Sequence, residues 1–424
     1  AYFIPAVEIR GTVCRTNMPP NTAFRGFGGP QGVCTIENVM EEIAAFLKKD
    51  ALEIRRLNCY GVGDRNITPY GQLVQNNTLD LAQNFSTKGN LSAFDVAPDG
   101  KKIAFASRGA LFVSDPNGTF LRQMPTHPQG RVMEVNWLAD SRTLLYTQVV
   151  DGWANIFTQT ADGRGQERQL TDDAARTRSL VLNHDRTQAA MLTGRNVLRL
   201  MDLKTFEQRT MAEGEFWAYT DLPLSFSPDD RFLAFTAYRH FEQDMFVHDL
   251  TTGQTHNLTT TAVTETSPVW SPDGKHLYFV TDRTQPSYPR GSGSPSIYRM
   301  ALQKYTQPLR TDAFDALWQP DSLKKKDSVA VVIEYEDLVD RWERVTRLGG
   351  VQYAPTLIGD GDKQTLLFIS THDGSSGLWK MTMEPFKEPK TDKVQPGLGG
   401  YAYAAAGGKH YLLASGTLHT LDVN

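Results

Sequence analysis

The segment NTAFRGFGGPQG, residues 21–32, combines four glycines, two phenylalanines and an arginine within twelve positions. Glycine has no Cβ atom, so the backbone can approach a bound group closely and can adopt angles closed to other residues. This composition is typical of a loop that lies against a ligand, and it differs from the repeating pattern of the rest of the chain.

Outside residues 21–32, serine and histidine residues do not occur at the spacings of known catalytic or metal-binding motifs. The segment GSGSPS, residues 291–296, is not a Gly-x-Ser-x-Gly nucleophile turn, and it lacks a flanking strand and helix, so we interpret it as a flexible loop. His240 and His248 flank a strand-like segment at a spacing that matches no zinc signature. We therefore predict no catalytic residue and no metal site.

One charged and aromatic run could have a role in binding. Arg341, Trp342, Glu343 and Arg344 alternate along a strand-like segment that could border a channel or a neighbouring domain. The alternative is a solvated rim, since charged side chains are usually exposed.

Composition excludes some classes of partner. The chain has 424 residues and a formal net charge of -4, with no basic stripe for nucleic acid. No run of eighteen apolar residues is present, so we expect no membrane span. The opening AYFIPAVEIR lacks the features of a secretion signal, and because it starts with Ala1 we expect a fragment or a processed product. A cytoplasmic and a periplasmic location both remain open.

Cysteine and histidine divide the chain. Cys14, Cys34 and Cys59 all lie in the first 59 residues, whereas all nine histidines lie beyond residue 120. Three cysteines fit reduced thiols better than a disulfide framework, an inference that covers only the N-terminal part. The two parts differ in composition as separate proteins would.

Residues 1–79 predict a small α+β segment with a strand, a loop and two helices. Apolar residues at helical spacing run from Ile36 to Leu47, and Asp50 is placed to cap a second helix that continues through Leu57. This segment is too short to bury the helical stripe without further partners.

From about residue 84 an Asp-centred turn recurs between two short apolar strands. Pro, Asp and Gly in such turns preset backbone angles, bond to nearby amides and accept positive φ, respectively. The marker residues are Asp99, Asp140, Asp185, Asp229, Asp273, Asp362 and Gly408, separated by about 41 to 46 residues except for one double gap.

A third and often a fourth short strand follow most turns, which predicts a mainly β fold: a seven-bladed β-propeller with four-stranded antiparallel blades. The double gap is either an eroded eighth unit at ALWQPDS or an insertion at about 312–328 in the fifth blade, before its outermost strand. We favour the insertion, because DSLKKKDS is charged and VAVVIEYEDLVDRWERV supplies one long strand without a hairpin. The last blade is incomplete, so either a strand such as AQNFSTKG closes the ring or it stays open.

The sequence CRTNMPPNTAFRGFGGPQG, continued by IENVMEEIA and EIRRLNCYGVGD, resembles the molybdopterin-binding subunit of xanthine dehydrogenase and aldehyde oxidase over residues 1–79. The resemblance implies that the backbone amide of Arg25 approaches the molybdenum centre and that Phe27 stacks on a heterocyclic substrate. The general-base glutamate, the other cofactor loops and iron–sulfur motifs do not follow, so we expect no bound cofactor. Molybdopterin would be implied only if this segment belonged to a complete enzyme.

Residues 80–424 resemble the propeller region of tricorn-like serine peptidases, on NLSAFDVAPDGKKIAFASRGALFVSD, DRWERVTRLGG and STHDGSSGLWKMTMEPF. That family carries its PDZ domain and its tail-specific-protease type core beyond the propeller. The resemblance therefore implies a non-catalytic propeller that gates or docks peptides for a protease core absent here, with peptides or the PDZ and protease domains as partners.

We interpret the chain as two unrelated pieces joined at about residues 76–84, and we expect it to be inactive alone. The alternatives are a fragment of a molybdenum hydroxylase and a stand-alone propeller binding module.

Overall fold

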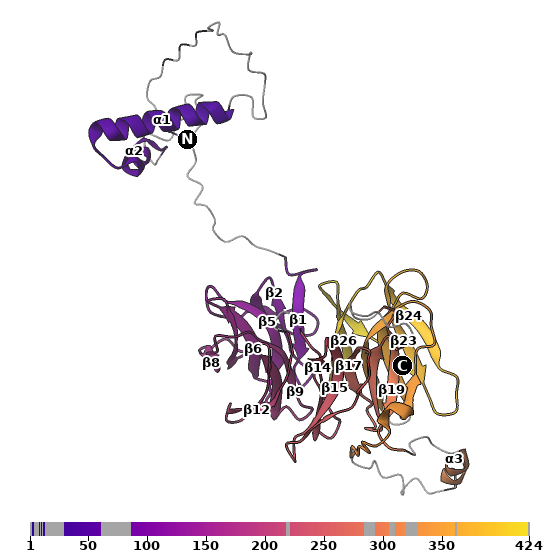
Figure 1. Ribbon diagram of the computed structural model, residues 1–424. Helices are drawn as coiled ribbons and strands as arrows, with labels where there is room; N and C mark the ends of the chain where they lie inside the picture. The colour runs from indigo at the N-terminus through magenta and orange to yellow at the C-terminus, as the bar shows by residue number, and fades with distance from the viewer. Residues whose placement is uncertain are drawn as a thin grey trace. The chain divides into compact units, whose positions relative to one another are not determined.

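The computed structural model describes residues 2–3, 8, 10, 12, 29–60, 86–217, 221–283, 293–304, 310–318, 329–360 and 363–422. The chain divides into two compact units, Ala1–Phe85 and Ser86–Asn424 (Figure 1). Among the described residues, no helix is long and apolar enough to cross a membrane.

The described part of the N-terminal unit is a helical pair, α1 (Gly29–Leu47) and α2 (Ala51–Asn58). The Asp50 side chain accepts a hydrogen bond from the backbone N–H of Leu52 at 2.6 Å, which confirms the predicted cap. Its described core consists of Met40, Ala44 and Ile54, with partly buried neighbours. More than a third of the Val39, Ile43 and Leu47 side chains is exposed, because two helices cannot cover both sides of an apolar stripe.

The second unit is the predicted propeller. Its described strands form seven antiparallel sheets in chain order, six of four strands and the last of three. The first four blades consist of β1 (Leu91–Val96), β2 (Ile103–Ser107), β3 (Ala110–Ser114) and β4 (Leu121–Gln123); β5 (Arg131–Trp137), β6 (Thr143–Val150), β7 (Trp153–Thr160) and β8 (Arg168–Gln169); β9 (Thr177–Leu182), β10 (Gln188–Thr193), β11 (Val197–Asp202) and β12 (Gln208–Glu213); and β13 (Ser225–Phe226), β14 (Phe232–Arg239), β15 (Glu242–Asp249) and β16 (Thr255–Asn257). The last three consist of β17 (Glu265–Trp270), β18 (His276–Thr281), β19 (Ser296–Ala301) and β20 (Trp342–Arg344); β21 (Gln352–Asp360), β22 (Lys363–Ser370), β23 (Gly377–Met383) and β24 (Lys390–Pro396); and β25 (Ala402–Ala406), β26 (Lys409–Ala414) and β27 (Thr417–Leu421).

The hydrophobic core of the propeller lies between its blades. Each pair of successive blades shares one cluster of buried side chains, and a further cluster joins blade seven to blade one. In that last cluster Phe94 and Phe105 of blade one pack with Tyr411 and Leu413 of blade seven, the purple and yellow ends of the unit in Figure 1. The ring thus closes by side-chain packing.

Two tryptophans, Trp137 and Trp270, lie in these interblade cores. Trp137 is fully buried and its Nε1 donates to the Asp95 carbonyl oxygen at 3.2 Å, while Trp270 Nε1 donates to the Ser225 carbonyl oxygen at 2.9 Å. Each indole therefore satisfies its polar atom on the preceding blade, which fixes the angle between two blades.

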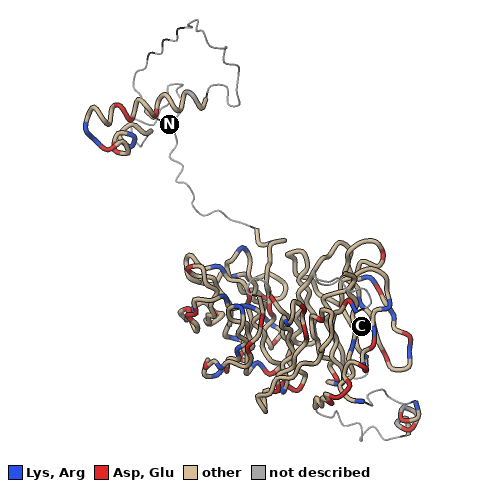
Figure 2. Tube along the Cα trace, viewed as in Figure 1, with Lys and Arg blue, Asp and Glu red and all other residues tan. Residues whose placement is uncertain are grey.

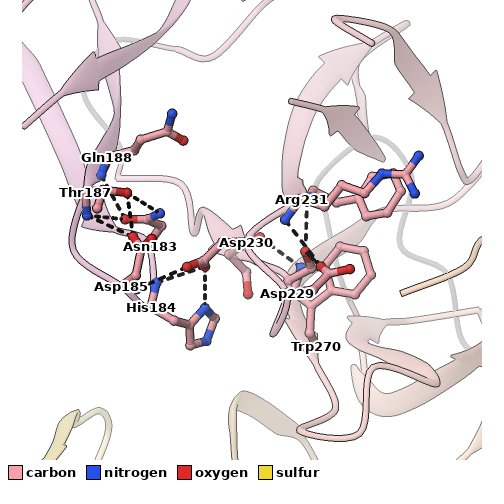
Figure 3. Close-up of polar contacts among 12 residues, drawn as sticks. Asn183, His184, Asp185, Thr187, Gln188, Asp229, Asp230, Arg231 and Trp270 are labelled. Carbon is pink, nitrogen blue, oxygen red and sulfur yellow. Dashed lines mark hydrogen bonds and ion pairs between the residues drawn. The ribbon is translucent and has the colours of Figure 1, made fainter. Parts of the chain in front are cut away.

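The Asp-centred turns lie at one end of the blades, the turn face, and they also join neighbouring blades. Asp185 folds its own turn by accepting from Thr187 N at 2.9 Å. Figure 3 shows the next contact: the Asp230 carboxylate of blade four accepts from the backbone N–H groups of His184 and Asp185 in blade three, at 2.9 and 3.0 Å. Asp229 accepts from Val331 N at 2.8 Å. The turn aspartates are structural.

Blade five differs from the prediction in one respect. The segment VAVVIEYEDLVDRWERV was predicted as one long strand, but only Trp342–Arg344 pairs, as β20, after a 3-10 turn at Leu338–Arg341. A Cβ on Gly274 would lie 2.9 Å from the side chains of both Val329 and Val331, so these valines occupy space that a glycine leaves open. The alternating valines in this segment therefore pack over the turn that contains Gly274, and they do not form a paired strand. The short helix α3 (Arg310–Ala316) precedes this segment.

Candidate functional site

Arg25 and Phe27, the residues assigned by resemblance to a molybdenum centre and its substrate, lie outside the described residues. The described N-terminal residues form two helices that leave several apolar side chains exposed, including Phe46 at 86% exposure. A cofactor pocket needs several converging segments. The described helical pair does not fit that requirement, and we derive no chemistry through molybdopterin.

In the described parts of the chain no cluster of three or more metal-ligating side chains occurs. His240 lies in the hairpin loop before β15, and His248 lies near the end of that strand. Burial lowers the pKa of His248, whose Nδ1 contacts Thr255 Oγ1 at 2.8 Å. Ser370 Oγ lies 2.8 Å from His372 Nδ1, but the next residue, Asp373, pairs with a lysine instead of with the imidazole. The contact between Ser370 and His372 therefore belongs to a local turn.

The run at 341–344 makes contacts within the propeller. Trp342 packs against Phe279 with ring centroids 4.8 Å apart, Glu343 pairs with Arg299 at 2.6 Å, and Arg344 donates to carbonyl oxygens of the following loop. These side chains hold β20 in place.

The strongest candidate site lies at the other end of the blades, the loop face, where each first strand begins and the loops between second and third strands lie. Three of its segments meet there: the connection after β12, the hairpin between β14 and β15, and the start of β17. We call the site formed by Trp217, Tyr238, Phe241, Glu242, Asp244 and Glu265 the loop-face site.

Its aromatic part projects from a strained hairpin. His240 and Phe241 form a two-residue turn with φ of 51° and 72°, a conformation that normally requires Asn or Gly at both positions. The Phe241 side chain is 79% exposed. Beside it the rings of Trp217 and Tyr238 stack at 4.2 Å with an interplanar angle of 8°. Strain of this kind persists where surrounding structure imposes it, often at functional sites.

Arg178 holds the aromatic part in position. This buried side chain donates to the carbonyl oxygens of Phe216 and Trp217 at 2.8 and 2.9 Å, and to that of Gly194 at 2.6 Å. The Arg178 guanidinium therefore holds the connection that carries Trp217 in place. Its positive charge makes these hydrogen bonds stronger than those between neutral groups.

The acidic part has more negative charge than the described cations balance. Asp244 pairs with Arg239 at 2.7 Å, but no described cation lies within ion-pair distance of Glu242 or Glu265. Burial, reinforced by the charges of Asp244 and Glu242, raises the pKa of the fully buried Glu265 to about 7, although Thr261 donates to its Oε1 at 2.7 Å. Burial and Asp244 also raise the pKa of Glu242.

This arrangement suits a cationic ligand with an apolar portion, because a positive charge relieves repulsion among carboxylates while aromatic faces cover apolar groups. Sequence reasoning missed the site, since its segments are far apart in the chain. The sequence feature that could have indicated the site is the two-residue hairpin loop His240–Phe241, where Asn and Gly are the usual residues. In Figure 2, Lys and Arg are interspersed with Asp and Glu along the described part of the propeller.

Comparison with known proteins gives different relatives for the two units. Residues 1–59 match the molybdopterin cofactor-binding domain. Xanthine dehydrogenase of Drosophila pseudoobscura pseudoobscura is 49% identical over 74 residues, 18% of this chain and 5% of that protein. Xanthine dehydrogenase 1 of Arabidopsis thaliana is 51% identical over 78 residues, 18% of this chain and 6% of that protein. The chain thus spans a small part of these relatives.

Residues 189–334 match the TolB beta propeller domain. The crystal structure of the tricorn protease superposes on 81% of this chain and 36% of that chain, with a TM-score of 0.57 and 16% identity. Kuenenia stuttgartiensis hydrazine synthase superposes on 81% of this chain and 98% of that chain, with a TM-score of 0.50 and 10% identity. At these identities the likeness of the propeller is one of fold, and it confirms the predicted tricorn-like propeller. The family match and the xanthine dehydrogenase relatives confirm the predicted resemblance of the N-terminal segment.

Proposed function

We propose that this chain carries the non-catalytic propeller of a tricorn-like serine peptidase and that it docks or gates peptides for a protease core outside the chain. The observation that carries this proposal is the loop-face site, which combines an exposed aromatic side chain with uncompensated carboxylates and has no nucleophile among its members. The fold it shares with the tricorn protease supports the assignment.

The site suits unfolded peptides with basic and apolar side chains. Phe241 stands clear of the hairpin and can cover an apolar side chain, while Glu242 is available to an ammonium or guanidinium group. The fully buried Glu265, whose pKa is raised to about 7, adds to the negative potential when it is ionised. A folded protein rarely offers an extended segment to such a hairpin, so the site favours flexible chains.

The test is binding of a fluorescent peptide rich in Lys and Phe to the full chain, followed by anisotropy. We expect saturable binding without cleavage. Phe241→Ala should weaken it about tenfold, since loss of an aromatic contact costs about 1 to 2 kcal/mol. Phe120→Ala is the matched control, because Phe120 is 75% exposed but lies in blade one, between β3 and β4. Equal binding by both variants and the parent chain would contradict the proposal.

A second candidate function rests on the identity of residues 1–79 to xanthine dehydrogenases: part of a molybdenum hydroxylase acting on heterocycles or aldehydes. Stoichiometric molybdenum in the purified protein would favour it over the peptide-docking role. We expect none, and we propose that residues 1–79 and 80–424 derive from unrelated proteins. One unbroken read of the encoding DNA across residues 76–84 tests this, since two separate molecules would remove the N-terminal segment from any functional account.

The match to the TolB beta propeller domain favours a third candidate, a stand-alone binding module. Retention of a stable protein partner by the immobilised chain would support it, whereas recovery of peptides alone would favour the docking role.

A further inference from the structure

The turn between β3 and β4 of blade one places an asparagine directly before a glycine. It spans residues 115–120, which read DPNGTF, and Asn117 and Gly118 are both exposed. An Asn-Gly step occurs once in the whole sequence. Such a step is chemically distinctive, because the side-chain carbonyl carbon of the asparagine and the next backbone nitrogen can close a five-membered ring.

Gly118 has open space around it. Its φ is 72°, and a Cβ at this position would meet no described atom within 4 Å beyond its chain neighbours. A glycine nitrogen has no Cβ beside it, so its approach to the preceding side chain meets little steric resistance. Asn117 donates to Asp115 Oδ2 at 3.1 Å, but it does so through its backbone N–H, and this bond does not engage the carboxamide.

Other asparagines of the propeller lack one of these features. Asn183 is 4% exposed, and its Oδ1 accepts from Thr187 N and Gln188 N at 2.9 and 2.8 Å. Asn196 is exposed, but it precedes Val197, whose branched side chain crowds its own backbone nitrogen. Exposure and an unhindered nitrogen therefore coincide at Asn117.

Asp115 holds the turn closed. Its carbonyl oxygen accepts from Gly118 N at 3.0 Å, and its carboxylate accepts from the backbone N–H groups of Asn117 and Phe120 at 3.1 and 2.6 Å. The backbone hydrogen bonds hold the pKa of Asp115 below its ordinary value. While Gly118 N–H is bonded in this way its nitrogen is not available for attack, so a reaction requires the turn to open. Opening exposes little further apolar surface, because Phe120 is already 75% exposed.

We propose that Asn117 is a site of spontaneous deamidation, with the backbone nitrogen of Gly118 as the nucleophile and water as the co-reactant. The Gly118 nitrogen loses its proton and bonds to Cγ of Asn117. The bond from Cγ to Nδ2 breaks, and Nδ2 takes up a proton and leaves as ammonia. The product is a succinimide ring that joins the two residues.

Water then opens the succinimide at either of its two carbonyl groups. Breaking the new bond between Cγ and nitrogen gives an aspartate at position 117. Breaking the original peptide bond leaves the chain running through Cγ, which gives an isoaspartate. Each product has gained the elements of water and lost those of ammonia, and no atom is oxidised or reduced.

The modification changes the charge and the geometry of the outer part of blade one. Either product adds a negative charge, and isoaspartate lengthens the backbone of a turn that Asp115 bonds at both ends. Shortly after this turn, Met124 donates its N–H to the Leu111 carbonyl oxygen at 2.8 Å and lies in the core between blades one and two. A lengthened turn therefore loosens β4. This turn is separate from the loop-face site, and the inference does not depend on the proposed function.

The test follows the full chain during incubation at pH 8, by mass spectrometry of the tryptic peptide of residues 109–122. We expect this peptide to acquire the mass of a product with –OH in place of –NH2, as two chromatographically separate species, while peptides with Asn183 and Asn196 stay unmodified. Aspartate as the sole product would overturn the proposal, because direct hydrolysis of the side chain does not pass through a succinimide. So would an unmodified Asn117 in the folded chain under conditions in which a synthetic peptide of residues 109–122 deamidates.

Two variants check the part that the turn plays. Asp115→Ala should deamidate at Asn117 about tenfold faster, because it removes two hydrogen bonds to a charged acceptor that oppose opening. Thr119→Val, at an exposed position of the same turn, is the matched control and should react at the rate of the parent chain. Equal rates in Asp115→Ala and the parent chain would overturn the requirement for turn opening.

Hydrogen exchange checks the consequence for blade one. Anion-exchange chromatography separates the deamidated chain, because it is more negative. Exchange at residues 121–124 should be faster in the isoaspartate form than in the parent chain, while exchange around Ile156 in blade two stays slow. Unchanged exchange at residues 121–124 would contradict the loosening of β4.

Discussion

Glu265 makes the stability of the propeller depend on pH, and Glu265→Gln should remove that dependence. Burial beside Asp244 and Glu242 raises the pKa of this carboxyl to about 7, from 4.5 in an unfolded chain. The folded state holds the proton of Glu265 more tightly than the unfolded state does. The resulting loss of folding stability is therefore absent below pH 4.5, grows between pH 4.5 and 7, and is complete above pH 7. The shift corresponds to about 3 kcal/mol of lost stability.

The neutral amide of Glu265→Gln retains the shape of the protonated side chain without its titration. The variant and the parent chain should therefore melt together near pH 4.5, and the variant should melt about 4 °C higher at pH 8, given the unfolding entropy of a unit of this size. All seven tryptophans lie beyond residue 136, so intrinsic fluorescence follows the propeller alone. Glu213→Gln, at an exposed position of β12, is the control. Parallel melting curves from pH 5 to 8 would refute the reasoning.

Three further outcomes are expected. Asp95→Ala should lower the unfolding free energy by about 3 kcal/mol in urea titration, because it removes the carboxylate that accepts from the backbone of Trp137 and pairs with a half-buried arginine of blade three; a loss below about 1 kcal/mol would contradict this. Gly416→Ala should speed proteolysis at the seam of blades seven and one, since its Cβ would lie 2.3 Å from a carbonyl oxygen, whereas Gly253→Ala, at a similar positive φ in open space, should not. Replacing His240 and Phe241 by Asn and Gly should stabilise the chain by about 1 kcal/mol and weaken peptide binding; unchanged binding would count against the loop-face site.

The propeller was predictable because its information is local. The turn chemistry around residues such as Asp185 and Asp273 is written in four or five consecutive positions, and it recurs at blade intervals. Trp137 and Trp270 lie in the cores between the blades that this repeat defines.

The errors and omissions arise from contacts distant in sequence. The valines at 329 and 331 alternate as in a strand, but the open space beside Gly274 in another turn determines their position. The loop-face site joins Trp217, Phe241 and Glu265 from three segments, and nothing local links them. The roles of Arg25 and Phe27 stay predictions that rest on resemblance.

Among the described residues, blades seven and one meet through a shared core of side chains, as the other neighbouring blades do, so the seven seams are alike in kind. The position at which the chain enters and leaves the ring is then a matter of connectivity, and a circular permutant opened at another seam should keep the same fold. A linker joining the old ends would have to run the full length of β27 to reach Leu91, because Leu421 and Leu91 lie at opposite ends of their blades. Such a linker would run beside β27, so its sequence should favour an extended conformation.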